Sequence, residues 1–272
     1  MEKKYRLLEN DTITVGGRTL YRIEALKKFA NVKKGDKGGY VEKEENLSHE
    51  GSCWVSGNAR VYGGAQVYGD ACVFGNAEIF GNACVFDNAR VDGNARVYGN
   101  ARVSDNAEIF GNACVFDNAR VDGNAQVYGN TCVSDNARVY GDTLVYGDAL
   151  VYGNAQVFGN AWVSDNACVS DNARVFGYAE VYGYAEVYGD AEVRSTRDYV
   201  VLKNIWSSGR YFTYTRSNGM WKVGCFYGTG EELIAKAYRD SEVSGREYKR
   251  VVEYVEAMYA DLGNDERQEA KK

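Results

Sequence analysis

The chain has 272 residues, 45% of them hydrophobic, with no proline and a formal net charge of −6. The acidic balance disfavours a nucleic-acid binder that relies on overall positive charge, and no run of 18 apolar residues is present to form a transmembrane helix. Seven cysteines without a visible secretory signal predict reduced thiols in a cytoplasm. The single histidine, His49, excludes mechanisms that need two imidazoles, including zinc held by three histidines.

Residues 1–50 differ from the rest of the chain and contain short strand-like segments at 21–26 and 39–41. They precede a long repeat region. Because the open end of a repeat stack exposes core side chains and backbone, it needs a terminal cap. We therefore predict that residues 1–50 form an N-terminal cap, with His49 as one of its residues.

Residues 51–194 are 24 consecutive hexads without an insertion. The pattern is Gly/Asp, Asn/Asp, Ala, a variable residue, Val and then most often Tyr or Phe, as in residues 57–62. Side chains alternate along a strand, so positions three and five share one face. That face is uniformly apolar and is predicted to point inward, while positions four and six point outward. Gly and Asn at positions one and two tolerate positive φ and predict a corner.

A short strand and a corner every six residues predict an all-β solenoid, a parallel β-helix in which three hexads close a turn of 18 residues. The 24 hexads then form about eight turns, roughly 38 Å tall at about 4.8 Å per turn. The inward Val61 with the small Ala65 four places on, repeated along the region, resembles the left-handed β-helix family of hexapeptide-repeat proteins. The left-handed coil is what this resemblance implies.

The repeated motif Gly-Asn-Ala-x-Val, preceded by residues 38–41 and 47–51, resembles the sequences of bacterial and prophage proteins labelled as acyltransferases. This resemblance raises acyl transfer as an activity. Hexapeptide acyltransferases typically use a histidine as general base at a trimer interface, often near a loop that interrupts the turns. Here His49 precedes the first hexad and no loop interrupts the repeat, so we expect no formed pocket around it. Five cysteines at outward position four, Cys114 and Cys132 among them on adjacent turns, predict surface thiols and no metal site.

Residues 195–272 are predicted to form a small α+β module. Strands are expected at 199–202 and 211–215, with a hairpin turn at 217–219 before 220–226. Thr229 is expected to cap a helix near 231–239, and Ser244 with Glu247 to form the capping box of a second helix. One face of that second helix is apolar and comprises Tyr248, Val251, Val252, Val255, Tyr259 and Leu262.

Three groups of outward residues are candidates for partner binding. The first is a stack of aromatic rings on successive turns, either a self-stacking ladder that stiffens the solenoid or a surface for a sister chain or partner: Tyr62, Phe80, Tyr98 and Phe116, with Tyr140, Phe158 and Phe176 on another face. The second is an arginine stripe that either holds an anionic partner or joins a salt-bridge network with nearby aspartates: Arg102, Arg120 and Arg138. The third lies around the C-terminal hairpin and either recognises a partner or packs the module onto the last turn: Arg210, Tyr211, Tyr214, Arg216, Trp221 and Lys222.

Residues 77–106 and 107–136 are nearly identical, and a 30-residue duplication is not a whole number of turns. It therefore moves everything beyond it to another face, which favours a spacer or scaffold over a site built across one face. We predict a non-catalytic, cytoplasmic scaffold or partner-binding protein that self-associates as a dimer or trimer. No cofactor, membrane or nucleic-acid partner is expected. The phage resemblance implies a host cytoplasm and antagonism of a host process. The alternative is an acyl-CoA-dependent acyltransferase that acts as a trimer through His49.

Overall fold

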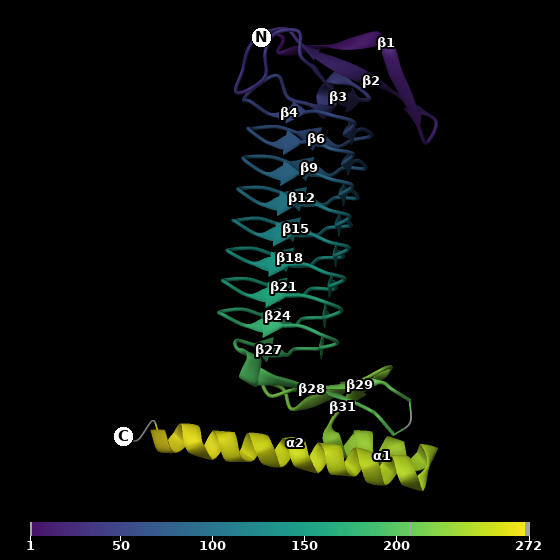
Figure 1. Cartoon of the computed structure of the whole chain (residues 1–272), viewed down its shortest axis with the longest axis vertical. Helices are drawn as coiled ribbons and strands as arrows, with labels where there is room; N and C mark the ends of the chain where they lie inside the picture. The colour runs from purple at the N-terminus through teal and green to yellow at the C-terminus, as the bar shows by residue number, and fades with distance from the viewer. Residues whose placement is uncertain (1, 207, 270–272) are drawn as a thin grey trace.

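The computed structural model describes residues 2–206 and 208–269, with side chains up to residue 262. Figure 1 shows a tall column of stacked turns, with the N-terminal strands at one end and the C-terminal helices at the other. Each hexad of the repeat forms one two-residue strand, from β4 (Trp54–Val55) to β27 (Glu192–Val193). Each strand pairs in parallel with the strand 18 residues further on, as Arg102 does with Arg120. The predicted parallel β-solenoid with three hexads per turn is therefore confirmed.

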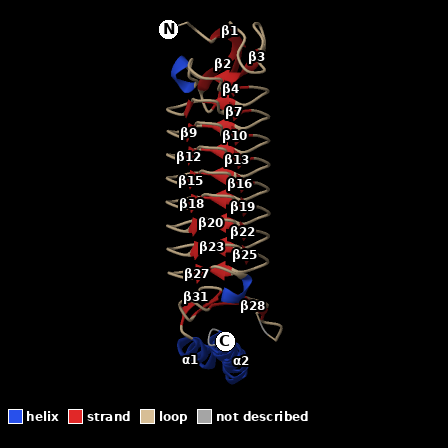
Figure 2. Ribbon diagram, turned by 90° about the vertical axis from the view of Figure 1, so that its left-hand side faces the viewer, coloured by secondary structure: helices blue, strands red, loops and turns tan. Residues whose placement is uncertain are grey.

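The strands form three sheets along the column, one per side (Figure 2). The β4 sheet consists of β4, β7 (Cys72–Val73), β10 (Arg90–Val91), β13 (Glu108–Ile109), β16 (Gln126–Val127), β19 (Leu144–Val145), β22 (Trp162–Val163) and β25 (Glu180–Val181). The β5 sheet contains β5 (Arg60–Val61), β8 (Glu78–Ile79), β11 (Arg96–Val97), β14 (Cys114–Val115), β17 (Cys132–Val133), β20 (Leu150–Val151), β23 (Cys168–Val169) and β26 (Glu186–Val187). The β6 sheet consists of β6 (Gln66–Val67), β9 (Cys84–Val85), β12 (Arg102–Val103), β15 (Arg120–Val121), β18 (Arg138–Val139), β21 (Gln156–Val157), β24 (Arg174–Val175) and β27.

The core is the continuous stack of position-three and position-five side chains. Val61, Ala65 and Ile79 are completely buried, and the same holds along the whole repeat. The predicted inward face is therefore confirmed. Burial of each valine contributes about 1.5–3 kcal/mol, and the small alanine leaves room for the neighbouring corner.

The corners use glycine and asparagine in different ways. Position one has positive φ, both where it is glycine, as at Gly99 (φ 71°), and where it is aspartate, as at Asp117 (φ 56°). The prediction that asparagine at position two shares this conformation is wrong, because no asparagine in the described repeats has positive φ. These side chains instead form amide ladders along the column, in which Asn82 Nδ2 donates to Asn100 Oδ1 at 3.3 Å and the series continues to Asp190.

The column starts earlier than the first hexad. β1 (Tyr5–Val15) and β2 (Arg18–Ala25) form an antiparallel hairpin that extends beside the top of the column (Figure 1), and β2 also pairs with β3 (Lys37–Val41). β3 then pairs in parallel with β5, and Leu47 bridges to Val67 beyond the short helix η1 (Glu44–Asn46). Residues 37–47 thus add a partial turn on top of the eight turns of hexads.

The two ends of the column need opposite caps. Within the repeat, backbone N–H groups at positions two, four and six of the hexad point to the following turn, as when Arg60 donates to Ala77 O at 2.9 Å. At the N-terminal end the carbonyls that accept such bonds have no preceding hexad, and residues before the repeat supply donors: Lys4 Nζ to Cys53 O at 2.9 Å and Asn46 Nδ2 to Ala65 O at 2.8 Å. The predicted capping role of this region follows from these bonds.

The C-terminal module covers the other end. Helix η2 (Thr196–Asp198) leads into an antiparallel sheet of β28 (Tyr199–Lys203), β29 (Tyr211–Thr215), β30 (Met220–Val223) and β31 (Phe226–Gly228), followed by α1 (Gly230–Asp240) and α2 (Glu242–Glu269). The last turn presents N–H donors, and hydroxyl groups accept them: Thr213 Oγ1 from Glu186 at 2.9 Å and Ser217 Oγ from Glu192 at 2.7 Å.

The helices agree with the sequence in all but one detail. Thr229 caps α1 in a capping box with Glu232. The predicted cap at Ser244 is wrong, because α2 starts at Glu242 and Ser241 Oγ accepts the Ser244 N–H at 3.0 Å. Ser241 ends α1, so the two helices are joined without a loop. The apolar face predicted for the second helix does pack into the module core. No helix in the described part of the chain is long and apolar enough to cross a membrane.

Candidate functional site

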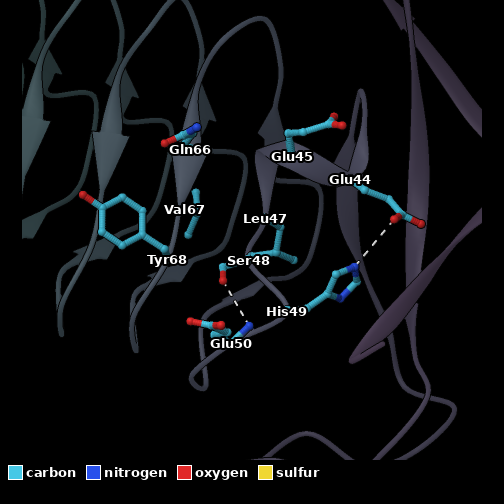
Figure 3. Close-up of a pocket in the computed structure, with 9 residues that line it drawn as sticks. All are labelled: Glu44, Glu45, Leu47, Ser48, His49, Glu50, Gln66, Val67 and Tyr68. Atoms are coloured by element: carbon cyan, nitrogen blue, oxygen red, sulfur yellow. Dashed lines mark hydrogen bonds and ion pairs between the residues drawn. The ribbon is translucent and has the colours of Figure 1, made fainter. Parts of the chain in front are cut away.

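The candidate site lies at the corner that joins the partial turn to the first hexads. Along the repeat, inward valines are six residues apart, but Leu47 and Val55 are separated by eight. The two additional residues widen this corner, which carries His49. Figure 3 shows the depression beside it, with a volume of about 590 Å³ and a lining of Glu44, Glu45, Leu47, Ser48, His49, Glu50, Gln66, Val67 and Tyr68. The expectation that no pocket forms around His49 is therefore wrong, because that expectation counted the turns from Gly51.

His49 is held in one orientation from three sides. Its ring stacks on Tyr5 with centroids 4.4 Å apart, and Nδ1 accepts the backbone N–H of Lys4 at 3.2 Å. Nε2 lies 3.7 Å from Glu44 Oε2. Figure 3 shows the ring turned toward Glu44 and away from Gln66 and Tyr68. The imidazole therefore faces the N-terminal strands and not the open side of the depression.

The electrostatics of His49 keep it neutral. Burial lowers the pKa of His49, and this effect exceeds the opposing influence of the Glu44 carboxylate. In the neutral form only one ring nitrogen carries a proton. Since Nδ1 accepts a hydrogen bond, that proton is on Nε2. Neither nitrogen then has a free lone pair with which to take a proton from a substrate, as a general base must.

Lys4 is a functional residue of the cap that sequence reasoning missed. Its side chain is buried, and Nζ donates to Cys53 O at 2.9 Å, to Glu50 O at 3.3 Å and to Gly51 O at 3.4 Å. Nζ also lies 3.2 Å from Cys53 Sγ, and burial raises the pKa of that thiol. The ammonium therefore supplies hydrogen-bond donors to the backbone carbonyls of the widened corner. Its contacts span more than 45 residues of sequence, so no local motif indicates them.

The aromatic stacks predicted from the repeat are formed. Tyr62, Phe80, Tyr98 and Phe116 stack with centroids 4.8–5.2 Å apart and planes within 4°. The second stack, Tyr140, Phe158 and Phe176, has spacings of 5.0 and 4.9 Å. All seven rings are half-buried, because each covers the faces of its neighbours. They present mainly ring edges to solvent, which is the arrangement of the self-stacking ladder.

The arginine stripe is formed on the β6 sheet without the predicted ion pairs. Arg102, Arg120 and Arg138 are register neighbours and exposed, and none of them pairs with a carboxylate among the described residues. The prediction that these arginines join a salt-bridge network is therefore wrong. The corner aspartates point along the column instead, as Asp135 Oδ2 accepts the Gly153 N–H at 3.0 Å. Arg138 and Arg120 still act on Asp122 through space, where their charges oppose the burial that raises the pKa of its carboxyl.

The residues predicted around the C-terminal hairpin do not share one surface. Trp221 and Tyr214 lie in the module core. Tyr211 stacks on Tyr184 of the solenoid at 4.2 Å, and Lys222 pairs with Glu186 at 3.3 Å. Of the other two residues, Arg210 is exposed, and Arg216 Cζ lies 5.9 Å from the ring centroid of Tyr259. The group mainly builds the module and joins it to the last turn, which was the other interpretation of these residues.

Comparison with known proteins agrees with the repeat architecture. A family model described as the YdcK beta solenoid repeat matches residues 55–69, 95–109 and 133–147. All three segments lie within the hexads that form the column. The chain is a repeat β-solenoid protein. No curated protein matches it.

The last turns of the β-solenoid carry an exposed apolar patch that the sequence interpretation did not single out. It comprises Trp162, Tyr178 and Tyr182, with 42%, 81% and 53% of their surfaces exposed. Trp162 is the register neighbour of Glu180, and the two tyrosines flank Glu180 in sequence. The available signal was the replacement of the corner asparagine by tyrosine at position 178. In the described part of the chain, no group of three or more histidine, cysteine or acidic side chains is arranged to hold a metal.

Proposed function

We propose that this β-solenoid is a non-catalytic scaffold that binds protein and self-associates through its last turns. The observation that carries the proposal is the exposed patch of Trp162, Tyr178 and Tyr182. Aromatic side chains are enriched at protein interfaces because each buries a large area at little conformational cost. A rigid column with both ends capped is suited to hold such a surface at a fixed distance from the N-terminal hairpin.

The patch departs from the repeat at positions where the repeat itself supplies a neutral alternative. Position four is Gln at three other turns, including Gln156, and position two is most often Asn. A Trp162→Gln/Tyr178→Asn double variant therefore keeps the fold and removes the apolar surface. The proposal predicts that the wild-type chain is a dimer or trimer by light scattering at several concentrations and that this variant is a monomer.

A matched control keeps the comparison specific. Glu108→Gln changes a half-buried charge, paired with Arg90, at position four of another turn and is expected to leave the oligomer intact. A wild-type chain that is monomeric at all concentrations would contradict self-association. In that case, a partner captured from a native cytoplasm by the wild type and lost with the double variant would still support the scaffold.

The second candidate function is an acyl-CoA-dependent acyltransferase that acts as a trimer. The depression beside His49 favours it, since it places a histidine next to an open cavity of about 590 Å³. The engaged Nδ1 and the proton on Nε2 count against His49 as the base. Calorimetry with millimolar acetyl-CoA distinguishes the two: the scaffold predicts no heat of binding, whereas the enzyme predicts binding and a turnover that His49→Ala abolishes.

The setting of the scaffold is also a proposal. Its supports are the resemblance to prophage proteins and the seven cysteines, all of which are free thiols. Seven is an odd number, so the cysteines cannot all be paired within one chain, which suits a reducing cytoplasm. We place the protein in a host cytoplasm, where its partner would be a component of the process it antagonises.

A further inference from the structure

One aromatic ladder has a missing ring. On the β4 sheet, Phe110, Tyr128 and Tyr146 stack with centroids 4.7 and 5.1 Å apart and planes within 5°. The preceding turn has Asp92 at the same position, and the turn before that has Phe74. Since successive turns are about 4.8 Å apart, the rings of Phe74 and Phe110 are separated by two turns, or roughly 9.6 Å. One planar ring would occupy the intervening level at the spacing that the ladder uses elsewhere.

The space between the rings of Phe74 and Phe110 is a cavity. Its volume is about 240 Å³, and it is lined by Phe74, Arg90, Asp92, Glu108, Ile109 and Phe110. The strands that carry it, β7, β10 and β13, follow one another along the column in Figure 2. A volume of this size suits a single ring and not a drug-sized ligand.

The groups around the cavity favour a cation. Asp92 Oδ1 accepts the Gly93 N–H at 2.5 Å, and Oδ2 has no partner in the described part of the chain. Arg90 Cζ lies 5.3 Å from the Phe74 centroid, and its guanidinium is 3.7 Å from Glu108. The Arg90 side chain is 56% exposed, so it can turn outward to Glu108 and leave the face of Phe74 to a ligand. Asp92 then remains as the unpaired charge.

Three other interruptions of the ladders are closed by their surroundings. Ser134, Ser164 and Ser170 also replace a ring at position six, but each is at most 9% exposed, so the neighbouring side chains close over it. The nearest equivalent is Asp122, whose hexad 117–122 is identical to 87–92. The preceding turn on its face has Ser104 in place of a ring, so Asp122 has an aromatic neighbour on one side only.

We propose that the gap at Asp92 is a binding site for an arylalkylamine, a planar aromatic ring that carries a protonated amine. The ring inserts between Phe74 and Phe110 in offset stacking contact with both. The ammonium donates to the free oxygen of Asp92 in a charge-assisted hydrogen bond. The site is separate from the Trp162 patch and does not depend on the proposed scaffold function.

Calorimetry with tryptamine at pH 7 tests the site, since tryptamine has an indole ring and a primary ammonium. The wild-type chain is expected to bind it, with N-acetyltryptamine, which lacks the charge, and 2-cyclohexylethylamine, which lacks the planar ring, each at least 10-fold weaker. A wild-type chain that does not bind tryptamine at millimolar concentration would overturn the proposal, as would equal affinity for all three compounds.

Two variants at Asp92 separate the ring site from the charge. Asp92→Phe places the ladder's own ring in the gap, so binding should be lost while the thermal midpoint rises. Asp92→Asn keeps the size of the side chain, and so the cavity, but removes the charge, so tryptamine affinity should fall to that of N-acetyltryptamine. Asp122→Phe is the matched control and should leave binding unchanged. Tryptamine binding that persists in folded Asp92→Phe, or that is lost in folded Asp122→Phe, would place the ligand elsewhere.

Discussion

The Nδ1 atom of His49 accepts a hydrogen bond from the backbone N–H of Lys4, at 3.2 Å. This bond joins the residue just before β1 to the widened corner before the first hexad. It also determines which ring nitrogen carries the proton, and therefore what the single histidine can do. The contact makes His49 a structural residue of the cap, with consequences for the pH dependence of stability.

Protonation of His49 should destabilise the folded chain. Because burial lowers the pKa of His49 in the folded state, the unfolded chain binds this proton first as the pH falls below about 6.5. The free energy of unfolding should therefore decrease between pH 7 and pH 5. In a His49→Asn variant, the amide side chain supplies an oxygen in place of Nδ1 and does not titrate, so part of that decrease should disappear. Urea unfolding at several pH values measures it, and an unchanged slope in the variant would contradict the assignment.

Loss of the Lys4 ammonium should weaken the cap. Lys4→Met keeps the buried aliphatic stem but leaves the carbonyls of Glu50, Gly51 and Cys53 without their donor. An unsatisfied buried polar group costs about 1–3 kcal/mol, and we expect a loss of this order in urea unfolding. Lys3→Met is the control, because the Lys3 side chain is 57% exposed and its ion pair with Glu44 is worth little. Equal losses in the two variants would exclude the capping role.

At position one of the hexad, alanine in place of glycine should cost more at Gly99 than at Gly183. At Gly99, an added Cβ would lie 2.7 Å from the backbone nitrogen of Asp117. At Gly183, which has a similar φ of 69°, nothing lies within 4 Å. Gly183→Ala should cost only the left-handed backbone strain, about 1–2 kcal/mol. Gly99→Ala should cost clearly more, and thermal unfolding of the pair measures the difference.

The hydroxyl of Thr213 should stabilise the contact between the solenoid and the C-terminal module. Thr213→Val keeps the shape of the side chain but removes the acceptor of the Glu186 N–H, at a cost of about 1–3 kcal/mol. Thr143→Val is the matched control. The Thr143 side chain is also buried, but its hydroxyl has no hydrogen-bond partner among the described residues, so its removal should be neutral or stabilising. A destabilised Thr143→Val with an unaffected Thr213→Val would reverse this assignment.

The repeat region could be predicted closely from its period. Six-residue spacing places Val61 and Ala65 in the core and brings Tyr62 and Phe80 onto neighbouring turns, because each follows from the alternation of side chains and from closure at 18 residues. The backbone conformation of Asn82 and its equivalents was predicted wrongly, since a residue that tolerates positive φ need not adopt it. Their side chains instead stabilise the column, because each amide donates a hydrogen bond to the equivalent amide of the next turn.

The candidate site could not be predicted to the same degree. The partial turn at 37–47 does not follow the hexad motif. Because the hexads were counted from Gly51, the widened corner between Leu47 and Val55 was not recognised. The direction of a carboxylate is set by its local corner, and for this reason Asp135 bonds to backbone and not to the arginine stripe. The apolar patch depends on Trp162 and Tyr178, which depart from the usual repeat on adjacent turns.

The opposite caps also have a consequence for assembly. The donors of the last turn and the acceptors of the first are complementary, so two uncapped columns could join head to tail in the register of the repeat. Lys4 and Asn46 occupy one of these ends and Thr213 and Ser217 the other. A chain truncated at both would be a building block for an open-ended filament, whereas a column that keeps both caps has a fixed length.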